Sequence, residues 1–257
     1  MKKTILCTMA AASFAITAPA ATISLNFVRA SNGAGLMTPT DVAGVVAVNN
    51  WNTATIANAN TGVAVPLTDD AGVVTTAIAN WQNAPGGNAW SVATAGAGSP
   101  GDMIMMTGYL DQGGNGAGAI HSISITNIPF AAYDVYLYHS SSGGPNRTAR
   151  YQANGIDIFT RNLDPANTFN GFTQAGYPTL AEAALGGGNP AGNYVRWEGL
   201  SGDLIMEGQG LGDDDGGSGG NTRRAPIQGI QIVEIPEPGS SMLFLVGSIA
   251  FLIRRRR

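Results

Sequence analysis

The stretch ARYQANGIDIFT, residues 149–160, carries the clearest hairpin signal in this chain. Residues 149–153 alternate apolar with polar side chains, and the run 156–160 is rich in apolar residues. Asn154-Gly155 stands between the two runs and suits a type I′ turn, in which both central residues need positive φ. We therefore expect two antiparallel strands joined at Asn154-Gly155.

Short runs of the same kind recur along the chain. Ile123 and Ile125 alternate with Ser and Thr, and residues 133–138 read as another strand. Further strand candidates are residues 22–28, 63–67, 73–79, 194–197, 204–207 and 227–233. Gly, Asn, Asp and Pro separate these runs, and a helical pattern is confined to residues 179–185. The sequence predicts an all-β fold, a single β-sandwich or jelly roll over residues 21–235.

The N-terminus has the three parts of a secretory signal peptide. Two lysines precede an apolar run at residues 5–16, and Ala18-Pro19-Ala20 supplies the small residues that signal peptidase reads. We expect cleavage after Ala20, so that residues 1–20 form a signal helix that is removed. An uncut anchor is the alternative, but the apolar run is shorter than the roughly 20 residues that a spanning helix needs.

The composition of residues 21–235 excludes several kinds of chemistry. Cys7 is the one cysteine of the chain and lies in the signal peptide, which leaves residues 21–235 without disulfides or thiolate metal sites. Lysine occurs only at positions 2 and 3, and residues 21–235 hold seven arginines against 16 acidic residues, a formal net charge of −9. So acidic a domain repels nucleic acid and anionic lipid, and we expect no nucleic-acid partner.

The C-terminus combines a rigid spacer, an apolar segment and a cationic end. Pro236-Glu237-Pro238 precedes the apolar run 242–253, and the chain ends on four arginines: Arg254, Arg255, Arg256 and Arg257. Such a cluster stays on the cytoplasmic side of a membrane, and its long side chains reach the head groups. We therefore expect a short transmembrane helix at residues 242–253, within a tail that covers residues 236–257.

This tail resembles that of PEP-CTERM proteins, in which Pro-Glu-Pro precedes a short membrane segment and a terminal Arg cluster. The resemblance implies that an exosortase in the inner membrane recognises Pro236, Glu237 and Pro238 and removes the tail. The protein would then reach the cell surface or extracellular matrix of a Gram-negative bacterium; a plain anchor that stays uncut is the alternative. A looser resemblance, of the runs 128–138 and 227–233 to strands of sugar-binding jelly rolls in exported bacterial proteins, supports the fold.

Tyr136 and Tyr138 are candidates for a glycan-binding platform. They lie on the same face of the run 133–138, and exposed aromatic rings stack on the C–H faces of sugars. Arg147 and Arg150 lie nearby in the sequence and offer donors to sugar hydroxyls. We therefore expect extracellular polysaccharide as a partner, and the alternative is that the tyrosine rings fill the core.

Two groups of residues are candidates for holding a metal ion. Asp213, Asp214 and Asp215 lie in a glycine-rich stretch, and adjacent carboxylates can share a calcium ion. The spacing does not fit an EF-hand, so we favour a solvated loop, with calcium as the alternative. His121 and His139 lie near the ends of expected neighbouring strands, but no metal-ligand spacing accompanies them. We expect no obligatory cofactor.

A polysaccharide-active enzyme is the main alternative to a binding role. Glu182, Glu198 and Glu207 are candidates for the two carboxylates that a glycosidase places across the scissile bond. Nothing in the sequence sets the separation of these carboxylates. We favour a non-enzymatic surface or matrix protein, and a calcium-stabilised structural matrix protein is the third hypothesis.

Overall fold

The computed structural model describes residues 20–31, 33–56, 64–84, 88–91, 95–96, 100–111, 119–140, 147–163, 168–184, 187–213 and 223–237. Residues Ala21–Ile235 form one compact unit. The predicted signal peptide, apart from Ala20, and the predicted membrane segment lie outside the described residues. Within the described part of the chain, no helix has the length and apolar character needed to cross a membrane.

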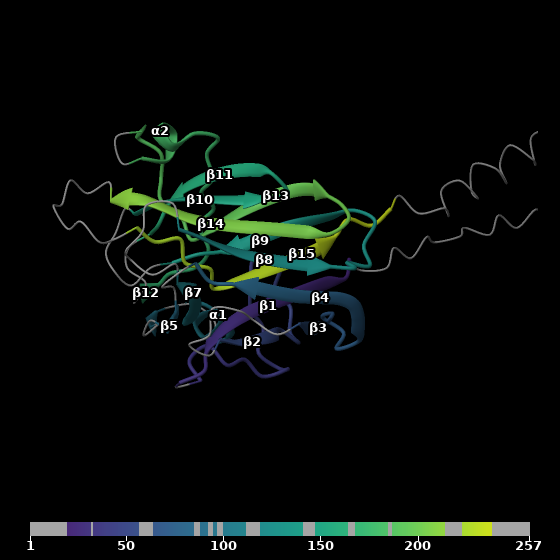
Figure 1. The fold of residues 1–257 in the computed structure, drawn as a ribbon. Coiled ribbons are helices and arrows are strands. Elements are labelled where there is room, and N and C mark those ends of the chain that lie inside the picture. The colour runs from purple at the N-terminus through teal and green to yellow at the C-terminus, as the bar shows by residue number, and fades with distance from the viewer. Residues whose placement is uncertain are drawn as a thin grey trace, which may run out of the picture. The chain divides into compact units, whose positions relative to one another are not determined.

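Two β-sheets pack face to face as a sandwich (Figure 1). The five-stranded sheet contains, in spatial order, β13 (Tyr194–Leu200), β9 (Tyr133–Tyr138), β15 (Gly229–Glu234), β1 (Thr22–Arg29) and β2 (Asn52–Ile56). The six-stranded sheet contains β11 (Ile156–Arg161), β10 (Arg147–Ala153), β14 (Leu204–Asp213), β8 (Ile120–Thr126), β4 (Val74–Gln82) and β3 (Val65–Thr68). The smaller elements are β5 (Asn88–Ser91) with β7 (Gly108–Asp111), β6 (Ala95–Gly96) with β12 (Thr168–Phe169), α1 (Pro100–Met105) and α2 (Leu180–Ala183). The predicted all-β sandwich is confirmed.

Neighbouring strands in the two main sheets pair antiparallel, except that β1 and β2 are parallel. β8 and β9 follow one another in the sequence but belong to different sheets. The connection between them passes through Asn127, whose φ is 56°, and crosses from one sheet to the other. The expectation that His121 and His139 end neighbouring strands is therefore wrong.

The main core lies between the sheets. Ile123 and Ile125 on β8 and Val135 and Leu137 on β9 face it and are buried. Each fully buried side chain of this size contributes about 1.5–3 kcal/mol to folding. The predicted alternation of buried and outward-facing residues is confirmed on β8.

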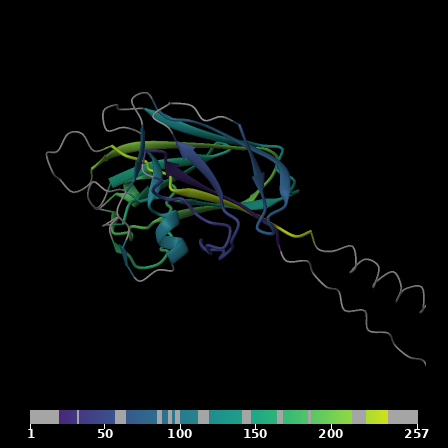
Figure 2. The same ribbon diagram turned by 90° about the horizontal axis from the view of Figure 1, so that it is seen from below.

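The outer face of the five-stranded sheet is also covered. Figure 2 shows α1 on this side of the molecule, and Tyr138, Trp51 and Met105 lie in a second apolar cluster there. Gln231 of β15 is buried in the same layer, where its Nε2 donates to Val46 O at 2.8 Å and its Oε1 accepts from the Tyr138 hydroxyl. Strands β9 and β15 are therefore buried on both faces.

Two of the predicted local structures, the hairpin turn and the short helix, are present in the structure. Asn154 and Gly155 have φ of 47° and 84°, so the predicted hairpin turn between β10 and β11 is confirmed. α2 begins after Thr179, whose side chain caps it, and stops at Ala184, which has extended backbone with ψ of 154°. The predicted helix at residues 179–185 is therefore real but shorter. Strands β2, β5, β6, β7 and β12 and helix α1 were not predicted.

Candidate functional site

The two tyrosines predicted to bind a glycan are buried. Tyr138 is 0% exposed and Tyr136 is 9% exposed. The Tyr138 hydroxyl accepts a hydrogen bond from Val45 N at 2.8 Å, and the Arg196 guanidinium lies 5.2 Å from the centre of the Tyr136 ring. Burial raises the pKa of both phenols. The prediction of an exposed platform is wrong, because the second apolar cluster and Arg196 cover the faces of these rings.

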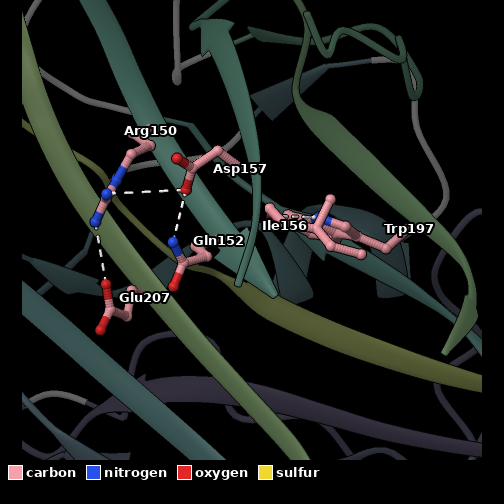
Figure 3. Close-up of polar contacts among 6 residues, drawn as sticks. All are labelled: Arg150, Gln152, Ile156, Asp157, Trp197 and Glu207. Atoms are coloured by element: carbon pink, nitrogen blue, oxygen red, sulfur yellow. Dashed lines mark hydrogen bonds and ion pairs between the residues drawn. The ribbon is translucent and has the colours of Figure 1, made fainter. Parts of the chain in front are cut away.

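The two predicted arginines differ in their surroundings. Arg147, at the start of β10, is buried and does not present its guanidinium as a surface contact. Arg150, on the same strand, lies between two carboxylates on the outer face of the six-stranded sheet (Figure 3). Its Nη2 donates to Glu207 Oε2 at 3.0 Å, and its Nη1 lies 3.8 Å from Asp157 Oδ1. Gln152 also donates to Asp157 Oδ1, at 2.7 Å, and completes a polar network.

The two histidines are fully buried. Burial lowers the pKa of His121 and of His139 to about 4, so both rings are neutral at pH 7. Nδ1 of His139 lies 2.6 Å from Asn162 Oδ1, which accepts only, so the neutral ring carries its proton on Nδ1. Among the described residues, no cluster of three or more His, Cys, Asp or Glu side chains is placed to hold a metal ion.

The predicted calcium loop lies almost wholly outside the described residues. Asp213 is the last residue of β14, and its backbone pairs with Arg147 of β10. Its side chain, and Asp214 and Asp215, lie outside the described residues. Calcium binding there stays a prediction.

The three glutamates predicted for an enzyme come from three different elements. Glu182 is on α2, Glu198 on β13 and Glu207 on β14. Glu198 Oε1 accepts from Arg196 Nη1 at 2.9 Å, whereas Glu207 is held by Arg150. Glu198 and Glu207 therefore belong to separate local networks, each with its own arginine.

A hollow of about 450 Å³ lies between β11 and β13, which are terminal strands of the two sheets. The segment of residues 173–177 runs between these strands and pairs with both. Ala175 N donates to Tyr194 O at 3.0 Å, and Tyr177 and Phe159 exchange two backbone hydrogen bonds of 2.8 Å. This segment closes part of the gap between the strands, and the hollow lies next to it, towards the start of β11.

The lining of the hollow combines apolar and polar side chains. It consists of Ile156, Ile158, Gln174, Arg196, Trp197 and Glu198. Trp197 is buried, and its Nε1 donates to Ile156 O at 3.0 Å, which ties β13 to the hairpin tip (Figure 3). The two isoleucines therefore offer an apolar wall, while Gln174, Arg196 and Glu198 offer hydrogen-bonding groups.

Arg196 is the centre of the polar side of the hollow. Its Nη2 donates to Asp134 Oδ2 at 2.5 Å and its Nη1 to Glu198 Oε1 at 2.9 Å. The hydrogen bond to Asp134 raises the pKa of Arg196, so the guanidinium stays cationic at every physiological pH. Two carboxylates and the Tyr136 ring thus hold this cation in place, with about a third of its side chain exposed.

Sequence reasoning missed most of this site. Arg196 and Glu198 alternate with the buried Val195 and Trp197, and that alternation could have placed both charges together on one face. Gln174 had no such signal, because residues 173–177 carry no strand pattern and are extended only through pairing with β11 and β13.

The fold and the tail together define an acidic β-sandwich that carries a C-terminal sorting signal. Residues 234–257 match the PEP-CTERM protein-sorting motif, which confirms the predicted resemblance to PEP-CTERM proteins. Pro236 and Glu237 are exposed, while Pro238 and Arg254–Arg257 lie outside the described residues. The motif implies an exported protein that is sorted through the membrane and processed by an exosortase.

No curated protein matches the chain. Among solved structures, an exo-β-1,3-galactanase from Phanerochaete chrysosporium with galactose is 18% identical over 67% of this chain and 32% of that chain, with a TM-score of 0.27. The same enzyme with β-1,3-galactotriose has a TM-score of 0.28 at the same identity and coverage. A cycloisomaltooligosaccharide glucanotransferase from Paenibacillus sp. is 13% identical over 71% of this chain and 20% of that chain, with a TM-score of 0.29. The chain therefore spans less than a third of the length of these proteins.

Proposed function

We propose that this chain is a non-enzymatic protein of the cell surface or extracellular matrix that binds a neutral polysaccharide in the hollow between β11 and β13. The sorting motif at residues 234–257 supports the location, because its processing delivers the β-sandwich outward. The observation that carries the binding role is the lining of the hollow, where apolar and hydrogen-bonding side chains face the same space.

The chemistry of the lining suits a sugar. A pyranose ring presents C–H groups that pack on apolar side chains, here Ile156 and Ile158, and hydroxyls that need donors and acceptors. Gln174 supplies both, Arg196 supplies donors and Glu198 supplies acceptors. The volume of about 450 Å³ is within the range of about 300–1,000 Å³ that is usual for small-molecule sites.

The charge of the domain favours a neutral rather than an acidic polysaccharide. Residues 21–235 have a formal net charge of −9, and both Asp134 and Glu198 pair with the one arginine that lines the hollow. An anionic chain would meet carboxylates that already balance this cation. A neutral glycan instead needs hydrogen bonds, which the fixed groups of the hollow can provide.

The ion pairs that the candidate carboxylates form with arginines favour a binding role over hydrolysis. A glycosidase sets two carboxyl groups across one scissile bond, about 5–9.5 Å apart. Glu198 and Glu207 are each held by a different arginine, on strands of different sheets. Release of reducing sugars from a bound polysaccharide, lost on replacement of either glutamate by Gln, would instead favour the enzyme.

The binding proposal is tested by affinity electrophoresis of the exported protein in gels that contain a neutral glucan, a galactan or an acidic polysaccharide. We expect retardation by a neutral polymer, and Arg196→Ala should weaken it about tenfold or more, since a lost charged hydrogen bond costs about 1.5–3 kcal/mol. Arg150→Ala is the matched control, because Arg150 is also held by two carboxylates but lies outside the hollow. Equal effects of the two substitutions, or retardation by the acidic polymer alone, would contradict the proposed site.

A further inference from the structure

The two ends of the β-sandwich are hydrogen-bonded to one another. β1 and β15 lie side by side in the five-stranded sheet, with Thr22 opposite Val233. One residue further out, Glu234 N donates to Ala21 O at 2.9 Å, and Ala21 N donates to the side-chain Oε2 of Glu234 at 3.2 Å. The nitrogen of Ala21 therefore faces a carboxylate.

The beginning of β1 is held from its other side as well. Thr22 N donates to Asp70 Oδ1 at 2.9 Å, and Asp70 N donates to Thr22 O at 2.8 Å. Asp69, in the same turn between β3 and β4, forms an isolated β-bridge with Ile23 of β1. Hydrogen bonds to two other segments therefore hold Ala21 and Thr22 in place.

We propose that Glu234 is a binding site for the N-terminal ammonium group of Ala21, which is created when signal peptidase cleaves after Ala20. In this hydrolysis the bond between Ala20 C and Ala21 N breaks, water adds its hydroxyl to the Ala20 carbonyl carbon, and the Ala21 nitrogen gains a hydrogen. The released amine takes up a further proton at neutral pH, because its ordinary pKa is about 7.7–8.0. A neutral amide donor thereby becomes a cation beside a carboxylate.

This ion pair is specific to the processed chain. Before cleavage, Ala21 offers one N–H to Glu234, whereas the ammonium offers three donors and a full positive charge. Glu234 precedes Pro236 by two residues, so N-terminal processing would fasten the strand that leads into the sorting motif. The proposal depends on cleavage after Ala20 and is independent of glycan binding.

The charged groups around the nitrogen all favour the ammonium form. Glu234 lies on β15, and Asp69 and Asp70 lie in the turn on the other side of β1. Tyr133, opposite Glu234 on β9, directs its hydroxyl to Gly202 O at 2.9 Å. A neighbouring negative charge stabilises a cation, so the amine should keep its proton to higher pH in the folded protein than in the unfolded chain.

The absence of lysine makes this amine directly observable. Lysine occurs only at positions 2 and 3, so a chain that begins at Ala21 contains one amino group, its own N-terminus. Reductive methylation of the exported protein with ¹³C-formaldehyde labels that group and preserves its ability to be protonated. The ¹³C shift followed against pH then reports the pKa of a single site.

We expect one titrating methyl resonance, with a pKa about 0.5–1 unit higher in the folded protein than in the same protein unfolded in urea. Glu234→Gln should remove most of this difference. Glu182→Gln is the matched control, because Glu182 lies on α2 and should leave the pKa unchanged. The comparison of folded with unfolded wild type decides the question even where Glu234→Gln fails to fold.

Three results would overturn the proposal. Intact mass could show that the exported chain begins at a residue other than Ala21, the pKa could be the same in folded and unfolded protein, or Glu234→Gln could fold and leave the pKa raised. Absence of glycan binding together with a raised amine pKa in the folded protein would contradict the proposed function and leave the ammonium site standing.

Discussion

Gly44 illustrates how tightly the chain before β2 packs on the five-stranded sheet. Its φ is 97°, and a Cβ built there would lie 2.4 Å from Gln231 Oε1. Gln231 is fully buried and hydrogen-bonded to Val46 and Tyr138, so it has little freedom to move away. Glycine is therefore required at this position by both the backbone and the contact.

We predict that Gly44→Ala lowers the free energy of unfolding by about 2–4 kcal/mol, from backbone strain and a disturbed polar layer together. Gly171→Ala is the control, because Gly171 has φ of 98° and nothing within 4 Å of the added Cβ. It should cost only the strain, about 1–2 kcal/mol. Urea unfolding of both variants measures the difference, and equal losses would mean that Gln231 yields to the new methyl group.

Burial of His121 and His139 predicts a stability that depends on pH. The pKa of each falls from about 6.5 in the unfolded chain to about 4 in the folded protein, so the unfolded chain binds protons more readily between these values. The stabilisation from keeping both rings neutral is complete above pH 6.5 and is lost as the pH falls towards 4.

Between pH 7 and pH 5 we expect the free energy of unfolding to drop by up to about 2 kcal/mol for each histidine. Unfolding by urea at a series of pH values measures this slope. In His139→Gln the slope should be roughly half as steep. A flat profile from pH 7 to pH 5 would show that the folded protein accommodates charged histidines.

The β10–β11 hairpin is attached to β14 by its turn as well as by the antiparallel pairing of β10 with β14. Asn154 Nδ2 donates to Asp203 O at 2.9 Å, and its Oδ1 accepts from Ile205 N at 2.7 Å, so the turn residue also fixes the start of β14. Asn154→Gly keeps the positive φ but loses both bonds, and Asn154→Ala adds backbone strain to that loss.

We predict that Asn154→Gly lowers the free energy of unfolding by about 1–2 kcal/mol and that Asn154→Ala lowers it by about 1 kcal/mol more. Equilibrium unfolding of the two variants separates the contribution of the side-chain hydrogen bonds from that of the backbone strain. Asn154→Gly with wild-type stability would mean that water replaces both hydrogen bonds at no cost.

The elements that could be predicted are those with a local signal. The Asn154-Gly155 turn and the alternation around Ile123 are read directly from neighbouring residues. β2 was missed because its alternation, with Ala54 and Ile56 buried, extends over only a few residues. Its position depends on parallel pairing with β1 and on Asn52, which donates to Ser24 O and Thr68 O. Tyr136 and Tyr138 were placed on the right strand but wrongly exposed, since the residues that cover them come from distant segments.

The site of the whole β-sandwich could not be predicted for the same reason, since it depends on segments that lie far apart in the sequence. The hollow exists because the terminal strands of two sheets, β11 and β13, come together around residues 173–177. A single sequence does not reveal which strands end their sheets. The sorting motif was predictable, because its three parts are contiguous in the sequence, and the match at residues 234–257 confirms it. The membrane segment at residues 242–253 stays a prediction.

Intact mass tests whether this sandwich is exported and sorted through its tail. Cells that produce the full chain are separated into membrane and extracellular fractions, and the mass of the protein is measured in each. We predict an extracellular species that begins at Ala21 and ends near Pro236-Glu237-Pro238. A membrane-bound species that still carries Arg254–Arg257, with nothing released, would show that the tail is an ordinary anchor and that the protein is not sorted outward.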